Sequence, residues 1–405
     1  METPFYEAKP ILEKLHNSDF EAFYVGGAVR DYLLKRQIGD IDIATSAKPD
    51  EIKQIFSKTV DVGAEHGTII VLHNNKSFEV TTYRAETGYD DFRRPKSVSF
   101  ISSLKEDLRR RDFTINAMAM DIEGTIYDYF DGRQHLKEKV IMTVDSPSER
   151  FSEDALRMLR AVRFVSQLGF TLCPETKEAL KELVHLLNAI SVERKTVEIE
   201  KLFQGAYYKA AIQTLIDCQV NNYLPGMAEK EHQLEILASF QLDLLTTRED
   251  LWTMITYKVE PPSVEKYLRK WKLPVKLIKI VEKNIRFLML LQQEKSWTSL
   301  LLYEAGSDCA LSVERIRSVI DDPNMVNENI NAVKDSLHRL PIHNKSQLDI
   351  TGHELIKIMK KKPGPWVAKL ISEIEKEIIL DKLENERSAI KEWVLKCNQN
   401  FEQNY

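Results

Sequence analysis

Gly39-Asp40-Ile41-Asp42-Ile43 alternates acidic and β-branched residues, a pattern that predicts a β-strand. Side chains two positions apart on a strand point to the same face, so Asp40 and Asp42 are expected to converge. Two converging carboxylates are suited to a hard cation. The same pattern is also common in exposed strands and turns that carry no chemistry, so the surrounding sequence has to decide between the two interpretations.

A glycine pair lies just upstream of this stretch. Phe20 to Val25 is predicted as a strand that turns at Gly26-Gly27 into a helix, with Arg30 on the first helical turn. A tight glycine turn lets the backbone approach a phosphate, and the N-terminus of the following helix adds N–H donors and partial positive charge. The turn and the carboxylate pair are therefore expected to share one end of a small sheet.

A phosphate seat beside paired carboxylates is the arrangement that nucleotidyl transfer requires. One Mg²⁺ lowers the pKa of an attacking hydroxyl, a second holds the triphosphate, and carboxylates hold both ions. Asp40 and Asp42 are the predicted metal ligands and catalytic residues. Glu79, in a neighbouring predicted strand, is a candidate third carboxylate, and an ordinary surface glutamate is an equally good interpretation of it.

An arginine run, Arg109-Arg110-Arg111, precedes Asp112-Phe113. Three consecutive side chains cannot share one face of a helix, so at least one of them is expected to point away from bulk water. Arg111, next to the break at Asp112, is predicted to point toward a nucleotide. A solvated basic surface is the alternative.

The segment from Glu153 to Phe164 is predicted as one helix with an apolar face. Asp154, Arg157, Arg160 and Arg163 recur in steps of three, so successive members are neighbours. A carboxylate that accepts from an exocyclic amine, beside a guanidinium that donates to a ring nitrogen, would take C and A and reject U and G. Asp154 with Arg157 could thus select two nucleotides, although most such patterns are surface ion pairs.

The composition limits the classes of protein that the chain can represent. Its 405 residues exceed what one hydrophobic core usually supports, so about two to four domains are expected. No apolar run approaches the roughly 18 to 20 residues of a membrane span and no secretory signal is evident, which predicts a cytoplasmic protein without membrane contact. The net charge of −5 does not suggest a nucleic-acid binder, but the basic region from Arg93 to Arg111 could hold a phosphate-rich ligand.

The order of predicted elements indicates an α+β fold, with a small mixed sheet and its helices first and an all-helical remainder from about Ser148. Breaks near Val144 to Pro147, Gly205 and Pro341 to Asn344 predict domains at 1–145, 146–205, 206–340 and 341–405. The predicted helices are Phe5 to Leu15 and Pro49 to Phe56, and the predicted strands are Ile41 to Ala44, Thr68 to His73 and Phe78 to Tyr83, with a hairpin at Asn74-Asn75 and a loop at Thr87 to Pro95.

Four motifs together resemble the bacterial-type (class II) CCA-adding enzymes, the tRNA nucleotidyltransferases of the DNA polymerase beta superfamily. They are Val25 to Asp31, Gly39 to Asp42, Arg110 to Ala117, and Glu153 to Arg163 with Asp154, Arg157, Arg160 and Arg163 in place. The resemblance runs over most of the chain, as far as Pro363 to Val367. It implies an elongated molecule with a nucleotidyltransferase head (1–145), a neck that recognises the base (146–205), a body (206–340) and a tRNA-binding tail (341–405).

The resemblance also implies the activity and its site. C, C and A would be added in turn to the 3′ end of tRNA from CTP and ATP with release of pyrophosphate, and the acceptor and T arms of tRNA would be recognised. Tyr89 to Pro95 matches the flexible loop that the family uses in switching from C to A. Asp40 and Asp42 would hold Mg²⁺, and the nucleotide would be bound by Gly27, Arg30, Arg111, Asp154, Arg157, Arg160 and Arg163.

Two alternatives stay open at this point. A bacterial poly(A) polymerase shares the head and neck pattern, but such relatives usually carry a long basic extension that this chain lacks. A non-catalytic RNA-binding relative would keep the fold without the chemistry, and the intact Asp40 and Asp42 argue against it. Whether the chain forms a homodimer is also left open.

Overall fold

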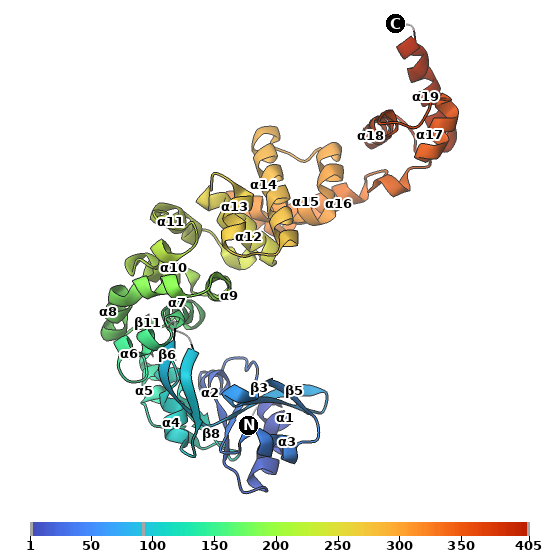
Figure 1. Cartoon of the computed structure of the whole chain (residues 1–405). Coiled ribbons are helices and arrows are strands. Elements are labelled where there is room, and N and C mark those ends of the chain that lie inside the picture. The colour runs from blue at the N-terminus through green and yellow to red at the C-terminus, as the bar shows by residue number, and fades with distance from the viewer. Residues whose placement is uncertain (1–2, 91–93, 403–405) are drawn as a thin grey trace. The chain divides into compact units, whose positions relative to one another are not determined.

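The computed structural model describes residues 3–90 and 94–402 and divides the chain into two compact units, Met1–Glu235 and Ile236–Tyr405 (Figure 1). The first unit contains a mixed sheet with helices, and the second is helical. This confirms the predicted α+β fold class. The finer division at residues 145, 205 and 340 stays a prediction.

The main sheet has seven strands in the order β3-β4-β5-β2-β1-β8-β9. The pair β2 and β5 is parallel, and the other neighbours are antiparallel. The strands are β1 (Ala22–Val25), β2 (Asp42–Thr45), β3 (Thr59–Gly63), β4 (Thr68–His73), β5 (Lys76–Thr82), β8 (Met118–Met120) and β9 (Ile126–Asp128).

The two faces of this sheet have different roles. Tyr24, Ile43, Val80 and Ile69 follow one another in register across four strands, and all are fully buried. Helix α1 (Thr3–His16) covers this face with Phe5, whose ring lies 4.9 Å from that of Tyr24. Burying side chains of this size contributes roughly 1.5–3 kcal/mol each.

The next register row lies on the opposite face and is polar at its centre, since Val25 pairs with Asp42, Asp42 with Glu79, and Glu79 with Ile70. The core therefore leaves the predicted carboxylates on the other side of the sheet. The helices of the head region are α2 (Gly27–Leu33), α3 (Pro49–Ile55), α4 (Leu104–Arg109) and α5 (Gly132–Glu138).

The predicted elements of the head are confirmed to within about two residues at each end, including the hairpin at Asn74-Asn75, where both residues have positive φ. The predicted loop at Thr87 to Pro95 is wrong in its outer parts. Strands β6 (Arg84–Asp90) and β7 (Arg94–Phe100) form an antiparallel pair there. Residues 91–93, at the centre of the segment matched to the flexible loop, lie outside the described residues.

The predicted single helix from Glu153 to Phe164 is also wrong. Helix α6 (Pro147–Glu153) ends at Glu153, Asp154 is extended with φ −136° and ψ 101°, and α7 (Leu156–Leu168) begins two residues later. The Asp154 carboxylate accepts a hydrogen bond from the Leu156 N–H at 3.1 Å. Such local bonds from Asp compete with the helical backbone, which explains the break.

The rest of the first unit is mainly helical. Strands β10 (Val140–Ile141) and β11 (Thr171–Leu172) form a short parallel pair, so this region is not entirely helical. Its other helices are α8 (Pro174–Leu183), α9 (Val192–Phe203), α10 (Tyr208–Asp217) and α11 (Glu231–Ser239), the last of which crosses the boundary between the units.

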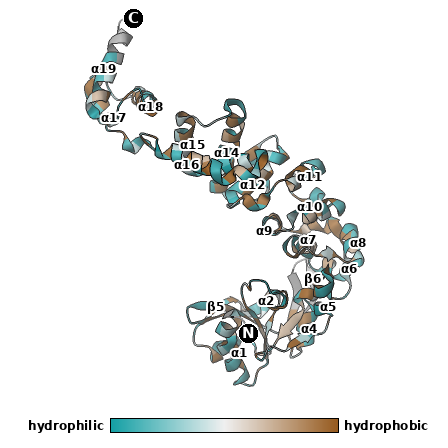
Figure 2. Cartoon of the chain, turned by 180° about the vertical axis from the view of Figure 1, so that it is seen from behind, coloured by the Kyte–Doolittle hydropathy of each residue, from teal (hydrophilic) through white to brown (hydrophobic). Residues whose placement is uncertain are grey.

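The second unit packs its helices around apolar side chains such as Trp252 and Trp271, which are fully buried with ring centroids 5.2 Å apart. Hydrophobic and hydrophilic residues alternate along its helices (Figure 2). In the part of the chain that the structure describes, no helix is long and apolar enough to span a membrane. The helices are α12 (Arg248–Val259), α13 (Val264–Lys270), α14 (Val275–Glu294), α15 (Ser299–Asp321), α16 (Val326–His338), α17 (Gly352–Met359), α18 (Trp366–Ile379) and α19 (Arg387–Glu402).

Candidate functional site

A pocket of about 700 Å³ in the first unit is lined by all the residues predicted as site residues from the sequence. They come from α2 and the turn before it, the segment that leads into β2, the segment that follows α4, and the α6–α7 region. The set is Gly27, Arg30, Asp40, Asp42, Arg111, Asp154, Arg157, Arg160 and Arg163. The pocket is also lined by residues to which the sequence assigned no role, among them Asn116, Phe164, Gln167, Arg194 and Lys201.

The glycine turn is tight against two of these residues. Gly26 has φ +72°, and a Cβ atom built on it would lie 2.9 Å from Arg111 Nη1 and 3.6 Å from Asp42 Oδ2. A Cβ on Gly27 would meet Arg30 Nη2 at 3.6 Å, an ordinary contact. The conformational requirement for glycine in this turn therefore falls on Gly26, and the nucleotide contact of Gly27 stays a prediction.

The sequence pattern predicted that Asp40 and Asp42 lie on one strand, and this prediction is wrong. Asp42 is the first residue of β2, whereas Asp40 precedes the strand and is exposed. Burial, followed by the negative charge of Glu79, raises the pKa of Asp42 to about 6, although Arg111 opposes the shift. Within residues 3–90 and 94–402 no cluster of three or more His, Cys, Asp or Glu side chains is arranged to hold a metal.

The raised pKa of Asp42 predicts a pH dependence of stability in the metal-free protein. A carboxyl group whose pKa is higher in the folded state stabilises the fold at low pH and loses that contribution as the pH rises through about 6. Relative to Asp42→Asn, which does not titrate, the parent protein should lose about 2 kcal/mol of unfolding free energy between pH 4.5 and 7.5. Urea titrations of both proteins in a chelator measure this difference. A difference that did not change with pH would contradict the assigned pKa.

Arg111 is a partly buried guanidinium with an unused Nε donor. Its Nη2 lies 3.8 Å from Asp107, and its Nε has no hydrogen-bond partner among the residues that the structure describes. Burial lowers the pKa of Arg111 while the charge of Asp107 partly offsets the effect. A buried donor of this kind is costly unless a ligand supplies the acceptor. Arg111 lines the pocket, and its predicted orientation toward a nucleotide stays a prediction.

A chain of hydrogen bonds crosses the floor of the pocket. Arg30 donates to Asn116 at 2.7 Å, and Asn116 donates to Asp112 at 3.0 Å. Arg160 donates through Nε to the same carboxylate at 2.7 Å. Burial alone would raise the pKa of Asp112, but the Arg160 charge and the hydrogen bonds from Asn116 and Arg160 outweigh it and lower that pKa to about 2. Asp112 is therefore an anion that holds Arg160 in place.

An aromatic ring lies among the arginines of this pocket. The Phe164 ring centroid is 5.2 Å from Arg30 Cζ, 5.6 Å from Arg160 Cζ and 4.5 Å from Arg163 Cζ. Arg163 also pairs with the buried Glu198 at 3.0 Å, and burial lowers the pKa of Arg163 to about 10. Packing against the ring fixes the planes of the guanidinium groups.

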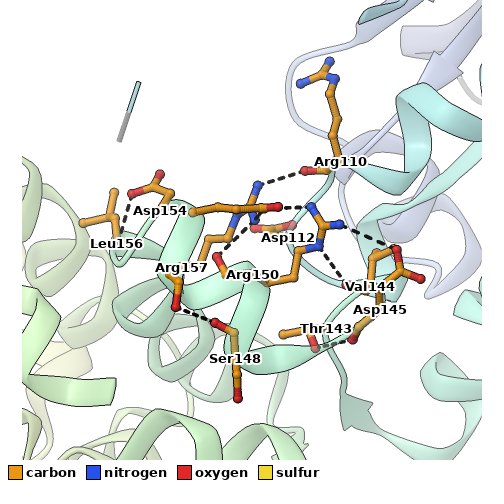
Figure 3. Close-up of polar contacts among 12 residues, drawn as sticks. Arg110, Asp112, Thr143, Val144, Asp145, Ser148, Arg150, Asp154, Leu156 and Arg157 are labelled. Atoms are coloured by element: carbon orange, nitrogen blue, oxygen red, sulfur yellow. Dashed lines mark hydrogen bonds and ion pairs between the residues drawn. The ribbon is translucent and has the colours of Figure 1, made fainter. Parts of the chain in front are cut away.

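The Arg157 and Asp154 side chains lie in the same pocket, but among the described residues neither is the other's hydrogen-bond partner. The Arg157 guanidinium donates to Glu153 at 2.5 Å and to the carbonyl oxygens of Arg150 at 3.1 Å and Arg110 at 2.9 Å. Figure 3 shows these contacts, with the Asp154 carboxylate bonded to the Leu156 N–H and not to Arg157. Arg157 is thus held rigidly between α6 and the end of α4.

Helix α9 supplies residues that the sequence analysis did not identify. Arg194 donates to Asp154 at 3.2 and 2.7 Å, Glu198 pairs with Arg163, and Lys201 lines the pocket. These positions are spaced i, i+4 and i+7, so they share one helix face. This spacing could have indicated a shared helix face in the sequence. Nothing local in the sequence indicated that the face lies against Asp154.

Models of known protein families match three segments of the chain. Residues 22–142 match the poly A polymerase head domain, 169–231 match a probable RNA and SrmB-binding site of polymerase A, and 244–394 match a tRNA nucleotidyltransferase domain 2.

Whole-chain relatives are also found. The CCA-adding enzyme of Geobacillus sp. (strain WCH70) is 45% identical, with 98% of each chain covered, and that of Bacillus subtilis (strain 168) is 45% identical over 98% of this chain and 100% of that one. The Bacillus stearothermophilus CCA-adding enzyme in complex with CTP superposes with a TM-score of 0.94 at 41% identity over 100% of both chains. A Thermotoga maritima CCA-adding enzyme complexed with tRNA shares the fold, with a TM-score of 0.61 at 22% identity over 96% of this chain and 94% of that one.

The sheet, the carboxylate pair and these matches define a nucleotidyltransferase of the poly A polymerase head type. Enzymes of this class are generally metal-dependent. The chain belongs to the CCA-adding enzymes, which add C, C and A to the 3′ end of tRNA without a nucleic-acid template. The family and the activity predicted from the sequence are confirmed.

Proposed function

We propose that the 700 Å³ pocket is where the chain transfers nucleotides from CTP and ATP to tRNA. The 3′ hydroxyl of the tRNA would attack the α-phosphate, and pyrophosphate would leave. The observation that carries the proposal is that the carboxylate pair, the glycine turn and the Asp154 and Arg157 side chains all line this one pocket. Nucleotidyl transfer with a choice of base needs all three parts.

Asp40 and Asp42 are the proposed ligands of Mg²⁺. When bound, the ion would lower the pKa of the attacking hydroxyl and neutralise charge on the triphosphate. The donor set fits a hard divalent cation, because Asp42 lies beside Glu79 and Asp40, whose like charges add to burial in raising its pKa. A cation would relieve this repulsion. Glu79, in register with Asp42 on β5, remains a candidate third ligand.

The triphosphate is proposed to lie against the β1–α2 turn. The backbone at Gly27 can approach it closely, and Arg111 offers an Nε donor that has no hydrogen-bond partner within residues 3–90 and 94–402. Arg30 contributes charge, while Asp31 and Asn116 fix its orientation. Arg160 and Arg163, each paired with an acidic residue, would shape the wall beside the nucleotide.

Asp154 and Arg157 are the proposed base-recognition pair. The carboxylate accepts from the exocyclic amine of C or A, and the guanidinium donates to the adjacent ring nitrogen. Because Arg157 is anchored by Glu153, Arg150 and Arg110, its remaining donors keep a fixed direction. A rigid donor can reject a ring N–H, as U and G present, more strongly than a mobile one.

We also infer the four-domain division 1–145, 146–205, 206–340 and 341–405, with the helical body and tail recognising the acceptor and T arms of tRNA. Duplex RNA is recognised largely through its shape, phosphates and 2′-hydroxyls, which needs no sequence motif. Lys360 to Lys362, at the end of α17, are candidate phosphate contacts. We infer the cytoplasm as the compartment, because a tRNA-processing enzyme acts where its tRNA substrate is found.

The direct test is incorporation into tRNA that lacks its 3′ CCA, with CTP, ATP and Mg²⁺. We expect the three added nucleotides to be C, C and A, followed by arrest, and sequencing of the product reads this out. A long A tail formed without C would instead identify a poly(A) polymerase. Recovery of activity after chelation by Mg²⁺, compared with Mn²⁺ and Ca²⁺, tests the metal.

Gly26→Ala is expected to weaken nucleotide binding at least about tenfold and to destabilise the first unit by about 1–2 kcal/mol, because φ +72° strains any L side chain and the new Cβ would meet Arg111 Nη1 at 2.9 Å. Two control variants separate these causes. Gly124→Ala has the same strain at φ +93° with nothing within 4 Å, and Gly39→Ala has open space without positive φ. The KM for CTP and urea unfolding are the measurements. Unchanged KM in Gly26→Ala would contradict the role of the turn.

A further inference from the structure

We propose that Arg194 is a specificity-determining positioning residue, which acts by holding the Asp154 carboxylate so that it presents a single acceptor to the incoming base. The inference rests on the proposed base recognition by Asp154. It adds a residue from α9 that lines the pocket and lies 40 positions away in sequence. In this role Arg194 works through Asp154 and need not touch the nucleotide.

The contact is a two-point hold. Arg194 Nη1 donates to Asp154 Oδ1 at 3.2 Å, and Nη2 donates to Oδ2 at 2.7 Å. The backbone N–H of Leu156 adds a third donor to Oδ1 at 3.1 Å. A forked guanidinium fixes the plane of a carboxylate, which a single ammonium contact cannot do. The side chain of Asp154 therefore cannot turn freely about its Cβ–Cγ bond.

The number of free acceptor positions follows from these donors. An ionised carboxylate offers about four lone-pair positions, two on each oxygen. Oδ1 of Asp154 already receives two donors and Oδ2 receives one. One position remains, and it is on Oδ2. This position suits one N–H of an exocyclic amine at one place in the pocket.

The same count explains rejection of the wrong bases. U and G present a carbonyl where C and A present the amine, and a ring N–H beside it. A carboxylate free to rotate could accept that ring N–H and so bind U or G. Held by Arg194, Asp154 cannot follow the displaced donor, and the carbonyl of U or G meets a negative oxygen. Arg194 thus prevents Asp154 from accepting the ring N–H of U or G, a contact that would weaken the preference for C and A.

The location of Arg194 agrees with this role. It is the third residue of α9, where a positive charge opposes the helix dipole at a cost of roughly 0.3–1 kcal/mol. Asp154 offsets that charge by pairing with Arg194 at 2.7 Å. Both side chains are partly exposed, at 24% and 20%, so an ion pair for stability alone would contribute little.

The test compares kcat/KM for CTP and UTP on tRNA ending before the first C, and for ATP and GTP on tRNA ending in CC. In Arg194→Ala we expect the C/U and A/G ratios to fall about tenfold or more, with kcat at saturating CTP changed only a few-fold. Arg194→Lys keeps the positive charge but loses the forked guanidinium. Its C/U and A/G ratios should lie between those of the parent and those of Arg194→Ala. Arg269→Ala is the matched control, since Arg269 pairs with Glu265 at 2.7 Å on the exposed surface of the second unit.

A double-mutant cycle separates positioning from direct contact. If Arg194 acts through Asp154, Asp154→Ala and Asp154→Ala/Arg194→Ala should have the same ratios. A further fall in the double variant would show that Arg194 contacts the nucleotide itself and would overturn the inference. Parent-like ratios in Arg194→Ala, or in Arg194→Lys, would also overturn it while leaving base recognition by Asp154 intact. Parent-like ratios in Asp154→Ala would overturn both the base recognition and this inference.

Discussion

Asp42→Asn is expected to lower nucleotide incorporation by at least about 10³-fold while the first unit stays folded. Asn keeps the shape of the side chain but removes the negative oxygen that a divalent cation needs, and catalysis of phosphoryl transfer depends on that charge. The variant should be at least as stable as the parent in metal-free buffer near pH 7.5, because the charged carboxylate is disfavoured there by burial and by Glu79. Loss of activity could therefore not be attributed to unfolding.

Single-turnover incorporation of C at saturating tRNA measures this effect, with unfolding by urea measured in parallel. Asp50→Asn is the matched control, since Asp50 is an exposed carboxylate on α3 of the same unit. Asp40→Asn tests the partner ligand and should also lose activity, although Asp40 lies outside the strand and is exposed. Incorporation within tenfold of the parent in Asp42→Asn would remove the carboxylate pair from the mechanism.

The position of the carboxylates could be predicted only in part, because a period of two does not show where a strand begins. Strand β1 ends at Val25, which pairs with Asp42, and Gly26 then turns the chain away. No partner on β1 remains for Ile41 and Asp40, so β2 begins at Asp42. Asp40 and Asp42 line one pocket, as converging side chains would, but they do not share the predicted strand.

Two further errors have local physical causes. Gly88, Asp90 and Pro95 are turn-forming residues and favour a loop, yet cross-strand pairing between β6 and β7 outweighs that preference. The apolar spacing of α7 extends into α6 without interruption, so periodicity could not reveal the break at Asp154. That break is made by one side-chain hydrogen bond to Leu156 N–H, which periodicity does not encode.

Contacts between residues far apart in sequence were the least predictable part of the site. The sequence assigned Asp154, Arg160 and Arg163 to a nucleotide, but it did not show that Arg194, Asp112 and Glu198 hold them. Each of these acidic and basic partners would pass for a helix-surface charge in a one-dimensional pattern. Only the packing of α7 against α9 and the end of α4 makes them part of the pocket.

Asp154→Asn is expected to reduce the preference for C over U, and for A over G, about 100-fold. Oδ1 of the parent carboxylate receives two donors, from Arg194 and Leu156, and Oδ2 receives one. The carbonyl oxygen of the substituted amide should therefore take the Oδ1 position and leave the NH₂ group at the Oδ2 position, beside the base. With C or A bound, the NH₂ donor then faces the exocyclic amine, which is unfavourable. With U or G bound, it faces a carbonyl, which is favourable. Replacing an acceptor by a donor at this position should change the free-energy difference between the right and the wrong base by roughly 1–3 kcal/mol.

Arg157 should limit how far the preference reverses. Its anchored guanidinium still donates toward the ring nitrogen, which suits C and A and opposes the ring N–H of U and G. Asp154→Asn should therefore add all four nucleotides with little preference, and should not become a U- and G-adding enzyme. Competition experiments with equal concentrations of CTP and UTP, read by sequencing, measure this outcome.

Arg157→Ala is a less decisive variant than Asp154→Asn. Because Arg157 also ties α6 to the end of α4, Arg157→Ala would change stability together with base choice. An unchanged preference for C and A in Asp154→Asn would exclude the carboxylate from base recognition.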